Sequence, residues 1–373
     1  MKRRRTNLLL LTTSLGVGGA EMVIKSLARS IDSERFAVTI CCLTSAGTIG
    51  EELVADGIEL HSFAGDVART DYLTPVKLRR LIVNKQIEIV HSHTTHALCD
   101  AVLCRWTRPF RLVHTFHFGN YPHLPGRVLW MERLASRFAD RLIAVGVEQR
   151  KQIASTYDRS TDSIGVIRNG VRVPQTSDTG PGSHAQVRSD TTIVVGTIAS
   201  LIPQKGLYDL LEVAKRVHDV HQQVRFVLIG EGIERSELLR RRHDMGLDDI
   251  VRMDGWLLNA GETALPAFDI YLHPSLWEAM SLSILEAMAA RKPVVSTNVG
   301  ESAHIIQHGV DGYLYQPGDV AGMAAAIIEL IERPEQRRRV GTAAAATIAS
   351  GYTESTMVRA YEKLYTDVLS QAS

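Results

Sequence analysis

The sequence lacks several features that would assign it to common protein classes. Its 42 basic and 41 acidic residues give a net charge of +1, so the bulk charge argues against nucleic acid as the main partner. No stretch approaches the roughly 20 apolar residues that a membrane-spanning helix needs. The apolar run Leu8–Leu11, within MKRRRTNLLLLTTSLGVGGAE, is too short for the core of a signal peptide.

Cysteine and metal-binding patterns are also sparse. The four cysteines, Cys41, Cys42, Cys99 and Cys104, show no CxxC spacing, so we expect reduced, mostly buried thiols in a cytoplasmic protein. No D-x-D triplet occurs anywhere in the chain, so a metal–diphosphate clamp of that kind is absent, and we expect no bound metal and no cofactor. The Lys2–Arg5 cluster could contact an anionic membrane and make the protein peripheral at its inner face, although such clusters are more often solvated tails.

Apolar strand-like runs alternate with helical patterns along both halves of the chain. In the first half we expect strands at Asn7–Thr12, Ala37–Leu43, Glu88–His91, Arg111–Thr115 and Arg141–Val145, with helices such as Ala20–Ser30 and Ala97–Arg105 between them. In the second half we expect strands at Thr192–Thr197, Arg225–Gly230, Ile270–His273 and Pro293–Ser296. This β/α alternation predicts parallel sheets.

The stretch PQTSDTGPGSHAQVRSD, rich in Pro, Gly, Ser and Asp, interrupts the alternation. We therefore expect an α/β protein of two similar domains, 1–175 and 191–352, joined by a linker at 176–190. The default ligand site of such a protein is the cleft between the halves, at the carboxyl ends of the strands.

The most informative segment is SLWEAMSLSILEAMAARKPVVS, which holds Glu278 and Glu286. We expect Glu278 in a loop, a helix beginning near Ser281 or Leu282, and Glu286 about one turn into that helix. The N–H groups of Leu282 and Ser283 would then form an anion site, for which phosphate is the commonest ligand. Carboxylates beside it could accept hydrogen bonds from sugar hydroxyls, so the segment suits a nucleotide sugar. The ordinary alternative is a pair of surface glutamates that favour the helix dipole.

A glycine-rich segment, GVGGAE (Gly16–Glu21), follows the first expected strand and opens a helix. Glycine lets the backbone approach a ligand and a helix start favours anions, so the segment resembles a phosphate loop. As a dinucleotide fingerprint it is poor, because Glu21 stands where GxGxxG has its third glycine. A plain tight turn explains it equally well.

Histidines and one lysine follow other expected strands. HSHTTH holds His91, His93 and His96, and HTFH holds His114 and His117. A metal site is conceivable there, but no carboxylate or cysteine spacing completes it. His117 fits a hydrogen-bonding role near a substrate as well as it fits a satisfied structural histidine. Lys205, in IASLIPQKG, could reach a diphosphate, although a lone lysine is more often simply exposed.

Taken in order, these motifs resemble those of the family-4 glycosyltransferases, which are retaining enzymes of the GT-B fold. The resemblance extends from about Leu8 to Tyr365 and rests on GVGGAE, HTFH, NGV (Asn169–Val171), PQKG, VLIGEG (Val227–Gly232), the Glu278–Glu286 segment with LEAMA, and KPVVS. It implies two Rossmann-like domains facing a central cleft, with an acceptor-side first domain and a donor-binding second domain. It also implies a C-terminal helix, within 353–373, that packs back on the first domain.

The resemblance carries roles over to individual residues. It implies that His117, Glu278 and Lys205 are catalytic, and that the donor is bound by Gly18, Gly19, Lys205, Gly230, Glu278, Leu282, Ser283 and Glu286. Glu286 would hold the ribose and Glu278 the donor sugar, both lining the cleft rather than the core. Lys205 and the helix-start amides would bind the diphosphate and stabilise its developing charge without metal.

The expected function is therefore retaining transfer of a sugar from a nucleotide sugar to a glycan or lipid-linked acceptor, in cell-surface polysaccharide synthesis. Three departures from the family pattern concern the donor site: EAMS (Glu278–Ser281) replaces EGFG or EGLG, Ser200 replaces an arginine, and GESAH brings Glu301 and His304 where GGxxE is usual. They favour the alternative of a catalytically weak GT-B protein that binds a sugar nucleotide or a partner enzyme.

Overall fold

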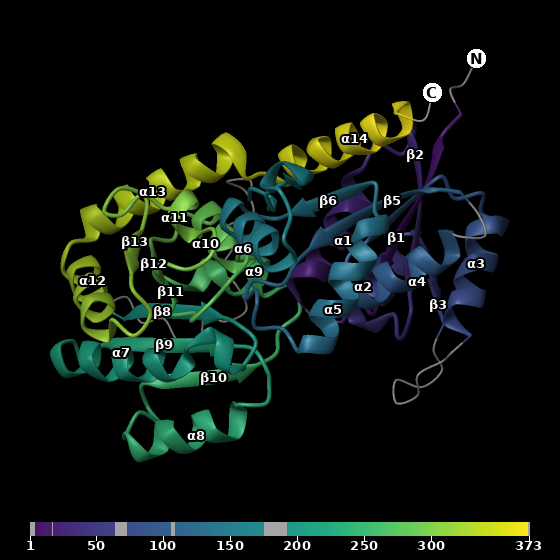
Figure 1. Cartoon of the computed structure of the whole chain (residues 1–373). Helices are drawn as coiled ribbons and strands as arrows, with labels where there is room; N and C mark the ends of the chain where they lie inside the picture. Colours follow the sequence, from purple (N-terminus) through teal and green to yellow (C-terminus); the bar gives the residue numbers. More distant parts are fainter. Residues whose placement is uncertain (1–3, 17, 64–72, 106–108, 175–191, 372–373) are drawn as a thin grey trace. The chain divides into compact units, whose positions relative to one another are not determined.

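The computed structural model describes residues 4–16, 18–63, 73–105, 109–174 and 192–371 (Figure 1). The expected linker at 176–190 lies outside the described residues, as do Lys2 and Arg3 of the basic N-terminal cluster. The chain divides into two compact units, Met1–Gly170 with Glu354–Ser373, and Val171–Thr353. Val171 and Thr353, the first and last residues of the second unit, form a β-bridge with each other. The division therefore falls a few residues from the expected domain boundaries.

The first unit contains a seven-stranded sheet in the order β3-β2-β1-β4-β5-β6-β7, and every neighbouring pair is parallel. Its strands are β1 (Thr6–Thr12), β2 (Phe36–Cys42), β3 (Glu59–Ser62), β4 (Ile89–Ser92), β5 (Arg111–Phe116), β6 (Arg141–Ala144) and β7 (Ile164–Val166). Leu8–Leu11 of β1 are fully buried, as a central strand covered on both faces requires.

The second unit repeats this architecture with a six-stranded parallel sheet in the order β10-β9-β8-β11-β12-β13. Its strands are β8 (Ile193–Ile198), β9 (Val224–Ile229), β10 (Val251–Gly255), β11 (Ile270–His273), β12 (Val294–Thr297) and β13 (Tyr313–Tyr315). The two expected parallel sheets are thus confirmed. In each unit the strand order reverses beside the first strand, so ligand-binding loops are expected after β1 and β4, and after β8 and β11.

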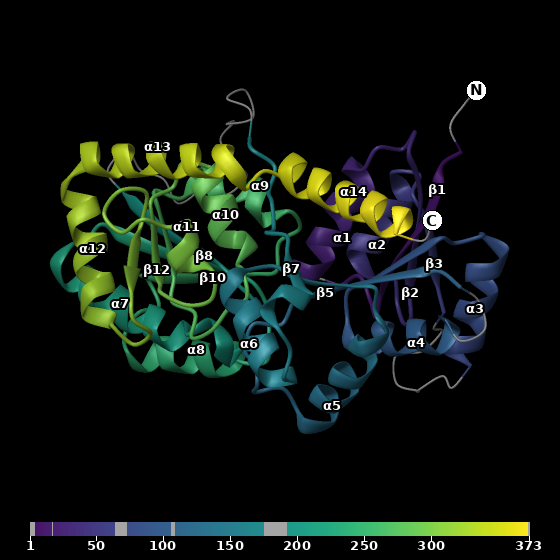
Figure 2. The same cartoon turned by 45° about the horizontal axis from the view of Figure 1, so that its top comes forward.

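Helices connect the strands in both units (Figures 1 and 2). They are α1 (Gly19–Ser30), α2 (Gly47–Ala55), α3 (Thr74–Asn84), α4 (Thr95–Arg105), α5 (Gly126–Ala135), α6 (Val147–Tyr157), α7 (Leu207–Val220), α8 (Arg235–Asp244), α9 (Ala260–Thr263), α10 (Leu282–Ala289), α11 (Ser302–Ile305), α12 (Val320–Glu332), α13 (Pro334–Gly351) and α14 (Glu354–Ser370). Among the described residues, no helix has the length and apolar character needed to cross a bilayer.

The C-terminal helix α14 packs on the first unit beside α1, as both cartoon views show (Figures 1 and 2). Two fully buried tyrosines anchor it. The Tyr365 hydroxyl lies 2.7 Å from Nδ1 of His91, and the Tyr361 hydroxyl lies 3.1 Å from Oγ1 of Thr115. The helix therefore contributes to the core of the unit that precedes it by almost two hundred residues in the chain.

All four cysteines are free thiols, and three of them are buried. Burial raises the pKa of the Cys42 thiol to about 12 and that of Cys99 to about 11, with smaller contributions from nearby carboxylates. The thiols are therefore protonated and unreactive at neutral pH.

Candidate functional site

The Glu278 segment adopts the expected local structure. Helix α10 begins at Leu282, Ser281 is its N-cap residue with an extended backbone, and Glu278 lies in the preceding loop after β11. The Ser281 side chain does not cap the helix, because its Oγ lies 3.1 Å from Oγ of Ser283 instead. The first amides of α10 are therefore available to an anion.

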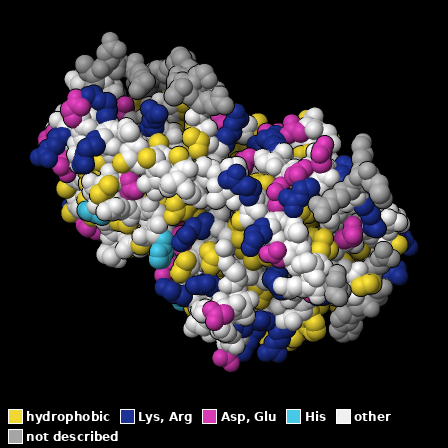
Figure 3. All heavy atoms as spheres, turned by 90° about the horizontal axis from the view of Figure 1, so that it is seen from above, with side chains coloured by type: hydrophobic (Ala, Val, Ile, Leu, Met, Phe, Trp, Pro, Cys, Tyr) yellow, Lys and Arg dark blue, Asp and Glu magenta, His cyan; other side chains and the backbone are white. Residues whose placement is uncertain are grey.

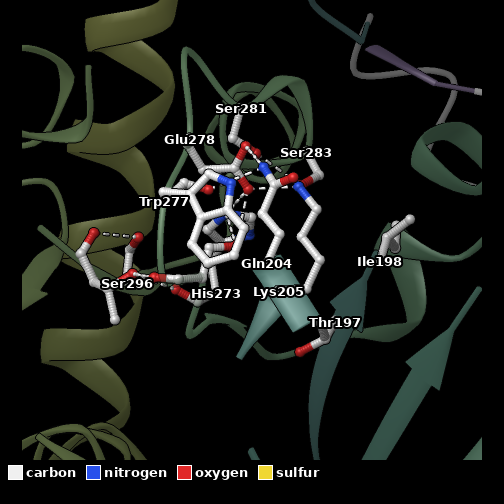
Figure 4. A network of polar contacts seen from close by, with 12 residues as sticks. Thr197, Ile198, Gln204, Lys205, His273, Trp277, Glu278, Ser281, Ser283 and Ser296 are labelled. Carbon is white, nitrogen blue, oxygen red and sulfur yellow. Dashed lines mark hydrogen bonds and ion pairs between the residues drawn. The ribbon is translucent and has the colours of Figure 1, made fainter. Parts of the chain in front are cut away.

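The carboxylate of Glu278 is the centre of a polar network (Figure 4). Its Oε1 atom lies 2.5 Å from Nζ of Lys205, and it accepts hydrogen bonds from Oγ of Ser275 at 2.8 Å and from the His273 ring at 3.2 Å. The side-chain amide of Gln204 donates to Oε2 at 3.3 Å and to the carbonyl of Trp277 at 2.9 Å. The loops after β8 and β11 thus meet at one carboxylate.

Charge and burial in this network shift the pKa of Glu278 in opposite directions. Burial alone would raise its pKa, but the positive charge of Lys205 and the hydrogen bond from His273 lower the pKa to about 2. Burial lowers the pKa of His273 from its ordinary value, against the effect of Glu278, so the ring is neutral near pH 7. Glu278 is therefore a permanently ionised carboxylate beside a lysine.

Burial differs between the two glutamates. Glu278 is 8% exposed, and the expectation that its side chain lines the ligand cleft stays a prediction. The lysine and the neutral donors around it allow the carboxylate to be buried while ionised. Glu286, one turn into α10, is half-buried, and its carboxylate lies against the backbone of Gly261 at the start of α9. A side chain at position 261 would meet Oε2 of Glu286 at 2.6 Å.

Lys205 is held by a turn that its own sequence dictates. Pro203 opens the short helix η5 (Pro203–Lys205), and Gly206 ends it with a positive φ of 59°. A Cβ atom on Gly206 would lie 2.1 Å from the carbonyl oxygen of Pro274. This close approach joins the Lys205 turn to the loop that carries Glu278.

Gly230 follows β9 and has a φ of 146°, and a Cβ atom there would lie 1.8 Å from the carbonyl oxygen of Ala199. The glycine is thus explained by backbone packing between the loops after β8 and β9. Its expected role in donor binding remains a prediction.

In the first unit, His117 follows β5 and its Nε2 atom lies 3.0 Å from Nδ1 of His93. Burial, and then the nearby His114, lower the pKa of His117 to about 3. His117 is therefore neutral near pH 7, and its Nδ1 atom has no protein partner among the described residues. A neutral ring with one unpartnered nitrogen can hydrogen-bond a hydroxyl group.

The neighbouring histidines have structural partners. His91 bonds to Tyr365 and Thr115, and His114 bonds to Oγ and the carbonyl of Ser92. Within the described ranges, no three His, Cys, Asp or Glu side chains are grouped in a way that could hold a metal ion.

The glycine-rich loop has an unexpected neighbour. Gly18 is the N-cap residue of α1, and a Cβ atom on it would lie 2.4 Å from Oε2 of Glu21. Burial raises the pKa of Glu21, and a hydrogen bond from its own backbone partly offsets this effect. The carboxylate of Glu21 therefore lies over the start of α1, beside Gly18 and Gly19, where the sequence predicts a phosphate contact.

The three departures from the family pattern all lie in the second unit. Ser200 is exposed in the loop between β8 and η5. Ser281 occupies the N-cap position of α10 without capping it through its side chain, and Glu301 is fully buried with its N–H bonded to the carbonyl of Ala279 at 3.0 Å. His304 is exposed in α11. The EAMS and GESAH segments thus pack against each other directly.

Sequence reasoning identified Lys205 and Glu278 but missed Gln204, His273 and Ser275. Gln204 adjoins Lys205, and His273 and Ser275 precede Glu278 by five and three residues. His273 and Ser275 lie at the end of β11, just before Glu278, and this position in the sequence could have pointed to them.

Comparison with known proteins matches each unit to a glycosyltransferase family model. Residues 17–174 match the family model described as Glycosyltransferase Family 4, and residues 190–333 match the model described as Glycosyl transferases group 1. Together the two models span most of the chain.

Individual relatives agree with this assignment. The chain is 26% identical to a phosphatidyl-myo-inositol mannosyltransferase of Mycobacterium leprae over 94% of each chain. It is 27% identical to a D-inositol 3-phosphate glycosyltransferase of Frankia alni, over 77% of this chain and 75% of that one. The fold matches that of HepE from Anabaena in complex with UDP-glucose, with a TM-score of 0.86 and 21% identity over 97% of this chain and 100% of that one.

Proposed function

Because the chain belongs to the glycosyltransferases, with a family-4 domain followed by a group 1 domain in a GT-B fold, we propose that it transfers sugar with retention at the anomeric carbon. The donor is a nucleotide sugar, and the acceptor is a glycan or a lipid-linked molecule. The observation that carries the proposal is the Lys205–Glu278 pair, in which Lys205 follows β8 and Glu278 lies in the loop that leads to the uncapped amides of α10.

Each residue has a role that suits its chemistry. As the bond between the sugar and the diphosphate breaks, negative charge develops on the diphosphate, and Lys205 with the amides of Leu282 and Ser283 stabilises it without a metal. Glu278, which is ionised at all physiological pH values, accepts hydrogen bonds from the sugar as the ring gains positive character. Glu286 holds the ribose hydroxyls.

The first unit supplies the acceptor side in this proposal. Neutral His117 hydrogen-bonds the reacting sugar through its unpartnered nitrogen, and the loop at Gly18 and Gly19 closes over the phosphates. Gly230 shapes the donor loop of the second unit.

The relatives support particular substrates. HepE of Anabaena has been solved with UDP, with UDP and glucose, and with UDP-glucose, which makes UDP-sugars the first donors to test. Relatives named for phosphatidyl-myo-inositol and for a diphosphoundecaprenol acceptor favour a lipid-linked acceptor. We therefore propose a cytoplasmic enzyme, peripheral at the inner face of an anionic membrane, that acts in cell-surface polysaccharide synthesis.

The alternative is a catalytically weak protein that binds a sugar nucleotide or a partner enzyme. Ser200 favours it, because this exposed residue cannot supply a second positive charge to the diphosphate. A thermal-shift screen against UDP-, GDP- and ADP-sugars, followed by turnover of the best ligand, separates the two. Stabilisation with turnover supports the transferase, whereas stabilisation without turnover supports the alternative. No stabilisation by any nucleotide sugar contradicts the transferase and the form of the alternative that binds a sugar nucleotide.

A further inference from the structure

One surface of the first unit combines exposed aromatic, aliphatic and basic side chains. It lies on α5 and on the short helix η1 (Ser136–Phe138) that follows it directly. Trp130 is 66% exposed, and Leu134 and Phe138 are each 41% exposed. The α5 surface, as we call it, consists of these three residues and the exposed arginines Arg127, Arg133 and Arg137.

Helical spacing places four of these residues on one face, and Arg133 and Phe138 flank that face. Positions 127, 130, 134 and 137 follow the spacing i, i+3, i+7 and i+10, which keeps side chains on the same side of a helix. The opposite face of α5 is buried and contains Glu132, whose carboxylate accepts hydrogen bonds from Tyr121 and Tyr157 at 2.6 and 2.5 Å and from Thr95 at 2.6 Å. In α5 the acidic residue Glu132 is therefore buried, whereas the apolar Trp130 is exposed to solvent.

The positive charge of the α5 surface is not neutralised. Its three arginines form no ion pair or hydrogen bond through their side chains with any described residue. Glu132, the one acid of α5 and η1, is buried, and Asp140 beyond them is already paired with Arg105 at 2.8 Å and Arg111 at 3.4 Å.

The pKa of the nearby Arg159 reflects the same excess of positive charge. Burial, and then the charges of Arg137 and Arg133, lower the pKa of Arg159. Figure 3 shows one face of the molecule, on which Lys and Arg side chains lie among Asp and Glu side chains.

We propose that the α5 surface docks the enzyme onto an anionic lipid membrane. Trp and Phe rings favour the headgroup level of a bilayer, and an arginine can bury its aliphatic stem there while its guanidinium binds lipid phosphate. The net charge of +1 for the whole chain makes a local basic patch with apolar side chains a better match for a lipid surface than for nucleic acid. This inference rests on the membrane location within the proposed function, and its test involves no sugar transfer.

A hollow beside the α5 surface has room for a lipid headgroup. It has a volume of about 420 Å³ and is lined by Arg105, Arg137, Phe138 and Asp140, among others. Its lining holds two arginines, Arg105 and Arg137, and one acid, Asp140, which is already paired with Arg105.

Co-sedimentation of the full chain with lipid vesicles tests the proposal. Wild type is compared on vesicles of phosphatidylcholine alone and of phosphatidylcholine mixed with phosphatidylglycerol, and we expect clear preference for the mixture. The double variant Arg133→Gln/Arg137→Gln should bind the mixed vesicles on the order of thirtyfold more weakly. Trp130→Ala should weaken binding roughly tenfold. A tryptophan emission shift on vesicle addition should also be reduced in Trp130→Phe.

Arg216→Gln/Arg359→Gln is the matched control, because it removes the same charge from two exposed arginines that lack side-chain partners among the described residues. It should bind vesicles like wild type, and every variant should keep the wild-type melting temperature and UDP affinity. Equal binding to both vesicle types, or equal loss in the control, would overturn the proposal. Loss of self-association or of RNA binding in the α5 variant, without loss of vesicle binding, would assign the surface to that partner instead.

Discussion

The ammonium of Lys205 and the carboxylate of Glu278 lie 2.5 Å apart, although 73 residues separate them in the sequence. Each closes a loop at the carboxyl edge of the second sheet, one after β8 and one after β11. Both side chains are largely buried, at 17% and 8% exposed, so each is the main counter-charge of the other. A change to either residue therefore affects the electrostatics of the whole donor site.

Lys205→Ala should weaken UDP binding by about 1–3 kcal/mol, because a charge-assisted hydrogen bond to the diphosphate is lost. The unpaired Glu278 carboxylate would also repel the diphosphate. Isothermal titration calorimetry measures the effect, and Lys215→Ala is the control, since Lys215 is an exposed lysine of α7 paired with Asp219. Unchanged affinity in Lys205→Ala would remove the lysine from the donor site.

Protein stability should depend on Glu278 at acid pH. Its pKa falls from 4.5 to about 2 on folding, so the ionised carboxylate contributes about 3 kcal/mol above pH 4.5, and this contribution is lost as the pH falls through 2. Denaturant unfolding of wild type and Glu278→Gln should therefore show a stability difference that shrinks from pH 5 to pH 2.5 or so. Other carboxylates titrate in both proteins and cancel. A difference independent of pH would show that Glu278 is not ionised in this network.

Ser275→Ala should impair catalysis through Glu278 rather than through contact with substrate. The serine hydroxyl donates to Oε1 at 2.8 Å, and its loss would leave the carboxylate held by fewer donors. We expect a lower kcat with nearly unchanged KM for the donor, and restoration by Ser275→Thr, which keeps the hydroxyl. A parallel loss in Ser275→Ala and Ser275→Thr would indicate that packing, rather than the hydrogen bond, matters at this position.

His117 should not titrate in the physiological range. Because burial lowers its pKa to about 3, the ring stays neutral from pH 8 to about pH 4 and gains a proton only below that. The profile of kcat/KM against pH should therefore have the same shape in wild type and His117→Gln above pH 5, with a lower plateau in the variant. An acidic limb near pH 6.5 that disappears in His117→Gln would contradict this assignment.

The sequence predicted the architecture because local patterns determine it. Buried runs such as Leu8–Leu11 mark central strands, and the N-cap position at Ser281 follows from the change of pattern there. The four edge strands β3, β7, β10 and β13 were missed, because runs of three to five residues are too brief to show a period.

The candidate site could be predicted only in part. Lys205 and Glu278 were recognised as separate residues through their motifs, but their direct contact depends on how two loops meet. The donors Gln204, His273 and Ser275 carry no signature of their own, since their role arises from proximity to Glu278. The position of Glu21 over Gly18 likewise depends on a side-chain conformation that no spacing rule supplies.

Changes to Glu278 and to Glu286 should affect kcat and KM differently. Glu278→Gln removes a charged acceptor that matters more as the sugar gains positive character, so it should lower kcat more than it raises KM for the donor. Glu286→Gln should do the reverse, because ribose contacts change little during the reaction. Since Glu278 is buried beside Lys205, its variant should also lose stability, whereas Glu286→Gln should not. Steady-state kinetics with a UDP-sugar and melting temperatures measure both effects.

The stereochemistry of the product decides whether the enzyme transfers sugar with retention at the anomeric carbon. With a turned-over nucleotide sugar, proton NMR of the first-formed product reports the configuration at the anomeric carbon before any equilibration. We expect the same configuration as in the donor, at a rate sharply reduced in Glu278→Gln. An inverted product, or retention at the wild-type rate in Glu278→Gln, would contradict it.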